Sequence, residues 1–158
     1  MIHYVQGNLF DSKAKVLVNA IDTVGVMGAG IAKDFKERYP DMFDRYQVLC
    51  STNKLNVGQL WLYKTQDKWI LGFPTKKHWR DPSKIEYIEA GLKKPKDSYR
   101  EKEITSIAFP KLGCGLGGLN WETQVQPLMD YYLGQIEADV FIYTTTSKIK
   151  IAGGIQTC

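Results

Sequence analysis

Two glycine-bearing segments are the parts of this chain best suited to bind an anion. One is Asp22–Ile31, and the other is Pro110–Leu119. Glycine permits positive φ and leaves backbone N–H groups bare, and each segment precedes a predicted helix whose N-terminus carries partial positive charge. A single loop of this kind is most often a simple turn, but two such loops can clamp two linked phosphates. Together the segments predict a diphosphate ligand.

Other ligand classes are disfavoured. Neither glycine segment ends in Gly-Lys-Ser/Thr, and neither has the full Gly-x-Gly-x-x-Gly fingerprint with its acidic partner, so a nucleotide triphosphatase is disfavoured. His3 and His78 are the only histidines, and Cys50, Cys114 and Cys158 are widely spaced. This spacing indicates neither a disulfide framework nor a zinc site. We therefore expect reduced thiols, no metal and no cofactor.

The segment Lys76-Lys77-His78-Trp79-Arg80 places cationic side chains around an indole ring. Such a combination can hold backbone phosphates and stack on the bases of single-stranded nucleic acid. The alternative is a surface loop whose Trp79 packs on the domain. The formal net charge of +4 does not decide between them, because a solvated basic surface explains it equally well. Nucleic-acid contact by residues 77 to 80 is therefore a hypothesis.

Alternating strands and helices must position these segments. Strands are expected at residues 2–6, 16–20, 59–63, 69–73, 104–109 and 140–144, and helices at 29–39, 42–50, 85–94 and 122–133. Pro40 should end the first helix, Asp41 should cap the second, and Pro95 should end the third. The alternation predicts an α/β domain whose helices cover the sheet, with ligand loops at the carboxyl ends of strands.

Length and composition fit one folded domain, because 158 residues with 44% hydrophobic and 24% charged residues can bury a sizeable core. We assign residues 1–144 to this domain. Residues 145–158 are expected to be a C-terminal tail, either a flexible end or a truncation junction. No apolar run approaches the roughly 18 residues of a membrane span, and the N-terminus has no signal-peptide pattern. We expect a cytoplasmic monomer without membrane contact.

Several motifs, in order, resemble those of macrodomains. They are Gly7-Asn8-Leu9, Val18-Asn19-Ala20, Val24–Ala32, Phe73–Arg80 and Pro110–Leu116. The resemblance runs from residue 2 to about residue 144 and is greatest to the branch that contains the DarG antitoxins and the terminal ADP-ribose glycohydrolase. It implies a mixed central sheet sandwiched between helices, a three-layer α/β/α arrangement. It also implies ADP-ribose in a cleft at the strand ends.

The resemblance assigns contacts along the ligand. Asn8 and Leu9 are expected near the adenine, and Tyr143 is expected to flank it, although a strand-end aromatic packed on the core is equally plausible for Tyr143. Cys114 fits a small buried residue better than a reactive thiol. The residues expected to bind ADP-ribose are Asn8, Leu9, Asn19, Asp22, Gly28, Ala29, Gly30, Ile31, Thr75, Gly113, Cys114, Gly115, Leu116, Gly117 and Tyr143.

The resemblance also implies a catalytic residue, since DarG-like proteins use a lysine in a Thr-Lys segment after a strand. The matching residue is Lys76. A lysine beside the anomeric carbon of an ADP-ribosyl bond can act as nucleophile or as an electrostatic and acid–base helper. The alternative is a solvated loop lysine, and Lys77 is a rival for any role.

Two positions depart from the family pattern. Gly117 stands where the terminal ADP-ribose glycohydrolase type has an aspartate, which argues against ester hydrolysis by a Lys–Asp pair. Asp22 stands where DarG-like sequences typically have an asparagine near the distal ribose. An aspartate can still accept hydrogen bonds from ribose hydroxyls, but it lacks the amide donor and adds negative charge near the phosphates. Asp22 is equally consistent with a simple turn residue.

The function implied is hydrolysis of the N-glycosidic link between ADP-ribose and a DNA base, which would reverse a DarT-like toxin. The expected partners are ADP-ribose, ADP-ribosylated single-stranded DNA and a DarT-like toxin. Rival enzymes are an ADP-ribose 1″-phosphate phosphatase and an O-acyl-ADP-ribose deacylase, and the glycine at position 117 disfavours the deacylase. A non-catalytic ADP-ribose reader is an alternative of a different class, distinguished by binding without turnover.

Overall fold

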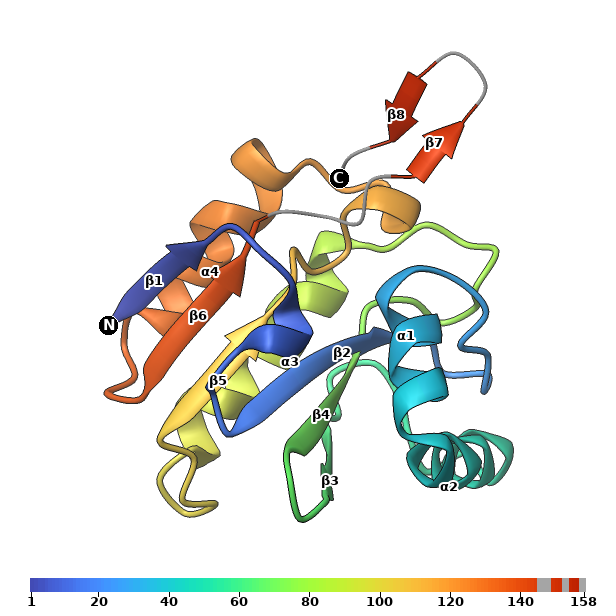
Figure 1. Cartoon of the computed structure of the whole chain (residues 1–158), viewed down its shortest axis with the longest axis horizontal. Coiled ribbons are helices and arrows are strands. Elements are labelled where there is room, and N and C mark those ends of the chain that lie inside the picture. The colour runs from blue at the N-terminus through green and yellow to red at the C-terminus, as the bar shows by residue number, and fades with distance from the viewer. Residues whose placement is uncertain (145–148, 152–153, 157–158) are drawn as a thin grey trace.

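A six-stranded mixed sheet forms the centre of the computed structural model, which describes residues 1–144, 149–151 and 154–156. The strand order is β1-β6-β5-β2-β4-β3 (Figure 1). Neighbouring strands are parallel except β3 and β4, which form an antiparallel hairpin. The strands are β1 (Ile2–Val5), β2 (Val16–Ile21), β3 (Trp61–Lys64), β4 (Trp69–Pro74), β5 (Ser106–Phe109) and β6 (Asp139–Tyr143).

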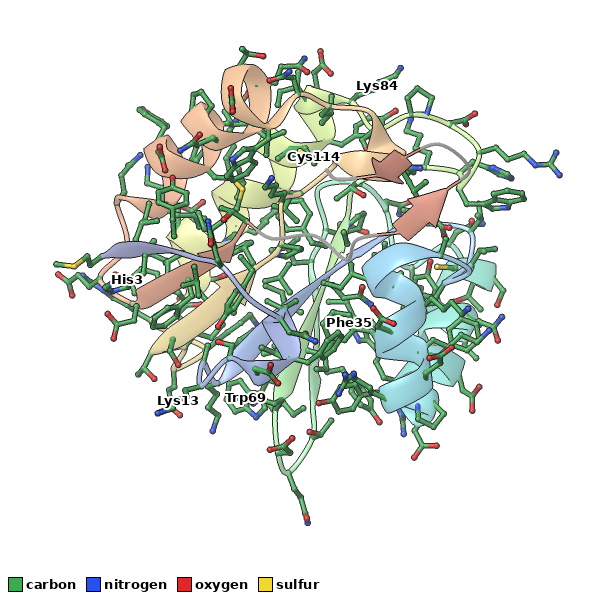
Figure 2. The ribbon with its side chains drawn as sticks, turned by 45° about the horizontal axis from the view of Figure 1, so that its top comes forward. His3, Lys13, Phe35, Trp69, Lys84 and Cys114 are labelled. Atoms are coloured by element: carbon green, nitrogen blue, oxygen red, sulfur yellow. The ribbon has the colours of Figure 1, made fainter. Side chains whose placement is uncertain are left out.

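Two helical layers cover the sheet. Helices α1 (Gly30–Arg38) and α2 (Pro40–Ser51) share one apolar cluster, which includes Phe35 between α1 and the sheet (Figure 2). Helices α3 (Ile85–Ser98) and α4 (Gln126–Leu133) share a second cluster on the opposite face. The predicted three-layer α/β/α arrangement is therefore confirmed.

Strand β2 shows why the two clusters lie on opposite faces. Val16 and Val18 belong to the α3/α4 cluster, whereas Leu17 and Ile21 belong to the α1/α2 cluster. Successive side chains of a strand point to opposite faces, so a strand buried on both sides reads as a continuous apolar run. The apolar side chains of β2 therefore pack into both clusters, which explains why they follow one another along the strand.

The proline predictions were wrong in part. Helix α1 ends before Pro40, as predicted, but Pro40 is itself the first residue of α2. A proline is tolerated there because the N–H groups of the first turn have no partner within the helix. Asp41 therefore lies inside the first turn of α2 and is not its N-cap. Helix α3 continues through Pro95 to Ser98, and the Tyr99 N–H donates to the Pro95 carbonyl at 3.0 Å. Pro95 is buried, and the helix continues through it although a proline cannot donate the backbone hydrogen bond of that position.

The remaining elements agree with the prediction to within a few residues. The predicted helix at 122–133 begins with a π-helical turn, Trp121–Val125, capped by the Asn120 side chain. In the predicted tail, Ile149–Ile151 (β7) pairs antiparallel with Gly154–Gln156 (β8). The rest of that tail, at 145–148, 152–153 and 157–158, lies outside the described residues. Within the described ranges no helix has the length and apolarity needed to cross a membrane.

The parallel strands bring the sequence motifs together. β1, β2, β4, β5 and β6 run in the same direction, so their carboxyl ends lie at one edge of the sheet (Figure 1). The predicted ligand segments begin at these ends: residues 7–9 after β1, 22–31 after β2, 75–80 after β4 and 110–119 after β5. The fold therefore builds its candidate site at this edge.

Candidate active site

The segment that carries Lys76 is fixed to the end of β2. The Thr75 N–H donates to the Ile21 carbonyl at 2.8 Å. The Lys77 carbonyl accepts hydrogen bonds from the Thr23 hydroxyl at 2.8 Å and the Thr23 N–H at 3.3 Å. The two chain neighbours of Lys76 are thus bonded to the last residue of β2 and to the start of the first glycine segment. This anchoring limits the positions that the Lys76 side chain can reach.

The Lys76 amine lies against the second glycine segment. Its Nζ donates to the Leu116 carbonyl at 3.0 Å and to the Trp79 carbonyl at 3.3 Å. Partial burial lowers the pKa of Lys76, while the negative charges of Asp22 and Asp81 act in the opposite direction. A lowered pKa increases the neutral fraction of the amine, which is the form that acts as a nucleophile.

Asp22 organises the first glycine segment. Its Oδ1 accepts hydrogen bonds from the N–H groups of Val24, Gly25 and Val26 at 3.0, 3.1 and 3.3 Å. The buried Tyr46 hydroxyl on α2 donates to the same oxygen at 2.5 Å. Asp22 therefore has the turn-forming role that the sequence left open, with a buried carboxylate as its centre. Its predicted contact with the distal ribose stays a prediction.

The N-terminus of α1 follows this turn and has no side-chain cap. Ala29 occupies the N-cap position in an extended conformation, and among the described residues no side chain caps the first turn. Gly28, Ala29 and Gly30 are exposed, and Gly30 has a φ of 59°. An uncapped helix start leaves N–H groups that an anion can take as hydrogen-bond donors. This geometry is suited to one phosphate of a diphosphate.

The two glycine segments face each other through Leu116. In the second segment, Gly113, Gly115 and Gly118 have φ values of 73°, 64° and 81°, which favour glycine. These turns leave the Leu116 side chain exposed, and its Cδ1 would lie 3.9 Å from a Cβ added to Gly30. The predicted pairing of the two loops is thus present in the structure.

Position 117 has no room for a side chain. A Cβ added to Gly117 would lie 2.5 Å from the Ser83 Oγ, a separation that real Cβ atoms essentially never show. An aspartate at this position would require Ser83 to shift. The glycine at position 117 therefore belongs with Ser83, a residue that the sequence reasoning missed.

Several predicted ADP-ribose contacts have structural partners of their own. The Asn8 side chain accepts from the Phe10 N–H at 2.9 Å and caps the short 3-10 helix Leu9–Asp11. Leu9 and Asn19 are buried, and the Asn19 Nδ2 donates to the Met27 sulfur at 3.7 Å. These three side chains support the loops, and their direct contact with ligand stays a prediction.

Tyr143 and Cys114 lie at the edges of the same region. Tyr143 is half-buried against the α1/α2 cluster, and its ring edge would lie 3.9 Å from a Cβ on Gly7. The sequence left core packing and adenine contact open for Tyr143, and this position is compatible with both. Cys114 is half-buried and packs against the α3/α4 cluster. No group of His, Cys, Asp and Glu within the described part of the chain is arranged to hold a metal ion.

The basic and aromatic segment lies at the surface beside Lys76. Trp79 is 46% exposed, and the contact with nucleic acid that the sequence suggested for it stays a prediction. The His78 ring stacks on Trp79 with centroids 5.6 Å apart, and the Arg80 guanidinium lies 4.7 Å from the Trp79 ring centre. Lys77 is exposed, with its Nζ 5.7 Å from the Tyr87 ring centre. These side chains form one cationic aromatic surface.

Comparisons with known proteins agree with this geometry. The Macro domain family model matches residues 18–128. The DNA ADP-ribosyl glycohydrolase of Mycobacterium tuberculosis is 41% identical over 160 residues, which cover 99% of this chain and 46% of that protein. The chain thus spans about half the length of the curated relatives that it matches.

Solved structures give the same relationship. The macrodomain of Mycobacterium tuberculosis DarG has a TM-score of 0.84 and 44% identity, with 90% of this chain and 97% of that chain covered. Thermosipho africanus DarTG in complex with ADP-ribose has a TM-score of 0.86 and 40% identity, and the match covers 90% of this chain and 41% of that chain. The chain belongs to the macrodomain family, in the branch that contains the DarG macrodomains.

Proposed function

We propose that this chain binds ADP-ribose and removes it from ADP-ribosylated DNA by hydrolysing the N-glycosidic link to a base. The observation that carries the proposal is the position of Lys76. Its amine is bonded to the second glycine segment, and its chain neighbour Lys77 is bonded to the first. A diphosphate held between the two segments would bring the distal ribose to this amine. The similarity to DNA ADP-ribosyl glycohydrolases supports the choice of DNA.

The chemistry follows from a neutral Lys76 amine. The nitrogen forms a bond to the anomeric carbon while the bond from that carbon to the base nitrogen breaks. The base leaves with the electron pair and takes the proton that the attacking nitrogen loses. The lysine-bound sugar opens to a Schiff base, and water then adds to it and releases ADP-ribose and the amine. The lowered pKa of Lys76 favours the first step by increasing the neutral fraction.

A single-stranded DNA substrate fits the surface beside the amine. Lys76 is bonded to the Trp79 carbonyl, so a nucleotide joined to a distal ribose at the Lys76 amine would lie next to residues 77–80. Lys77 and Arg80 would contact phosphates. Because His78 and Arg80 already lie on the Trp79 ring, a base would stack on this group or displace one of its members.

The wider setting rests on the relatives. A Thermosipho africanus relative is a fusion of a DNA ADP-ribosyl transferase with a DNA ADP-ribosyl glycohydrolase. By analogy, a DarT-like toxin is the source of the modified DNA and a partner of this chain, which acts in the cytoplasm as a monomer. In this proposal residues 1–144 form the catalytic domain.

The decisive experiment measures release of ADP-ribose from a thymidine-modified single-stranded oligonucleotide. We expect release by the wild type, none by Lys76→Ala, and wild-type release by Lys93→Ala, an exposed lysine of α3. ADP-ribose affinity, measured by calorimetry, should persist in Lys76→Ala. Lys77→Ala tests the rival lysine and should raise KM without lowering kcat. A wild type that binds ADP-ribose and releases none would instead be a reader.

A further inference from the structure

Ser83 lies between the Lys76 segment and the second glycine segment. Its side chain is buried, with 5% of the residue surface exposed. The Ser83 N–H donates to the Gly117 carbonyl at 2.9 Å. Its Oγ is also buried and has no hydrogen-bond partner among the described residues. A buried hydroxyl without a partner is unfavourable and rare in folded proteins, so its position requires an explanation.

The Ser83 hydroxyl and the Lys76 side chain border the same small space. A Cβ added to Gly117 would lie 2.5 Å from the Ser83 Oγ and 4.0 Å from the Lys76 Cε. Because Gly117 has no side chain, nothing from that residue lies between the Ser83 hydroxyl and the Lys76 side chain. The carbonyl that now accepts from Lys76 belongs to Leu116, the residue immediately before Gly117. Ser83 therefore touches the part of the loop that holds the amine.

The hydrogen-bonding needs of the amine change when it reacts. At rest the Nζ donates to the Leu116 and Trp79 carbonyls. A neutral amine has two N–H groups and a lone pair, and the lone pair must point at the anomeric carbon. An amine that turns away from Leu116 keeps Trp79 as one acceptor and needs a second. The unpartnered Ser83 Oγ is an acceptor that borders the same space.

We propose that Ser83 is a positioning residue, whose hydroxyl accepts a hydrogen bond from the Lys76 amine when that amine leaves the Leu116 carbonyl to attack the sugar. The inference rests on the proposed function and adds a second residue to the same site. It also gives the glycine at position 117 a role, because a side chain there would lie between the Ser83 hydroxyl and the Lys76 side chain.

The kinetic test compares Ser83→Ala with Ser12→Ala on the modified oligonucleotide. Ser12 is also buried, but its Oγ accepts from the Ala14 N–H at 3.1 Å, and its carbonyl accepts from Lys68, so it serves a structural role. We expect Ser83→Ala to lower kcat roughly 10- to 100-fold with KM nearly unchanged. Its thermal midpoint should not fall, because no hydrogen bond is lost. Ser12→Ala should lower the midpoint and leave kcat unchanged.

An activity-independent test follows the titration of Lys76 by NMR of 13Cε-labelled lysine, with Lys76→Arg for assignment. With ADP-ribose bound, Ser83→Ala should lower the Lys76 midpoint, because the lost acceptor stabilised the charged form. Without ligand the midpoint should not move. An unchanged midpoint in both states, or an unchanged kcat, would overturn the role of Ser83. A wild type without activity but with the ligand-dependent shift would reject the hydrolase and retain the contact.

Discussion

The Tyr46 hydroxyl donates its one proton to Asp22, whose Oδ1 lies 2.5 Å and whose carbonyl oxygen lies 2.9 Å away, and so joins α2 to the first glycine segment. Both residues are buried. Burial and the bond to the carboxylate raise the pKa of Tyr46, so the phenol stays protonated and remains a donor. The shape of the loop that leads to α1 thus depends on a helix residue outside every sequence motif.

We expect Tyr46→Phe to weaken both folding and ligand binding. The change keeps the ring but removes a buried bond to a charged acceptor, which is worth about 1.5–3 kcal/mol. Urea denaturation should show a loss of this size, and calorimetry should show weaker ADP-ribose binding. Tyr131→Phe is the matched control, because the Tyr131 side chain is 65% exposed. Equal effects of the two changes would contradict the role of Tyr46.

Asp22→Asn should tighten ADP-ribose binding while keeping the loop. The amide oxygen can accept the same N–H and O–H donors as Oδ1, and the change removes a negative charge near the diphosphate site. Asp22 raises the pKa of Lys76, so its neutralisation should lower that pKa further. The acid limb of the kcat profile should then move to lower pH. A shift to higher pH would show that the two groups do not interact as described.

Cys50 gives a stability prediction at high pH. Burial and the nearby Asp22 carboxylate raise the pKa of the Cys50 thiol from its ordinary 9.0 to about 11. The unfolded chain therefore loses the thiol proton first, and the stabilisation, complete below pH 9, is lost as pH rises from 9 through 11. The free energy of unfolding should fall over this window. In Cys50→Ala the free energy of unfolding should fall less steeply over the same pH window, whatever the absolute stability of the variant.

Borohydride trapping tests the covalent step directly. Reduction during turnover should convert the Schiff base into a stable amine and attach ADP-ribose to Lys76, which peptide mass spectrometry would locate. No adduct should form in Lys76→Ala. Release of ADP-ribose by the wild type without any adduct would show that Lys76 assists attack by water and does not attack the sugar itself.

The sequence predicted the motif loops well because strand ends and glycines are local signals. β2 and its turn illustrate this: a buried apolar run stops at Asp22, and the glycines follow. Tyr46 and Ser83 carried no such signal, because a tyrosine in an amphipathic helix and a serine before a helix each have an ordinary explanation. Their roles arise from contacts with residues 24 and 34 positions away in the chain, which only the folded structure supplies.

The cationic aromatic surface predicts a specific salt dependence. Each cationic side chain that contacts a phosphate of a single strand adds about 0.7 to the magnitude of the slope of log affinity against log salt. Removing two such contacts in the double variant Lys77→Ala and Arg80→Ala should therefore reduce the magnitude of this slope by about 1.4. Trp79→Ala should weaken binding at all salt concentrations with little change in slope, because stacking is not ionic. Affinity for free ADP-ribose should be unchanged in both, since neither change touches the glycine segments. Fluorescence anisotropy with a modified oligonucleotide measures the slopes. An unaltered slope in the double variant would place the DNA strand elsewhere on the molecule, while Lys76 would keep its role at the anomeric carbon.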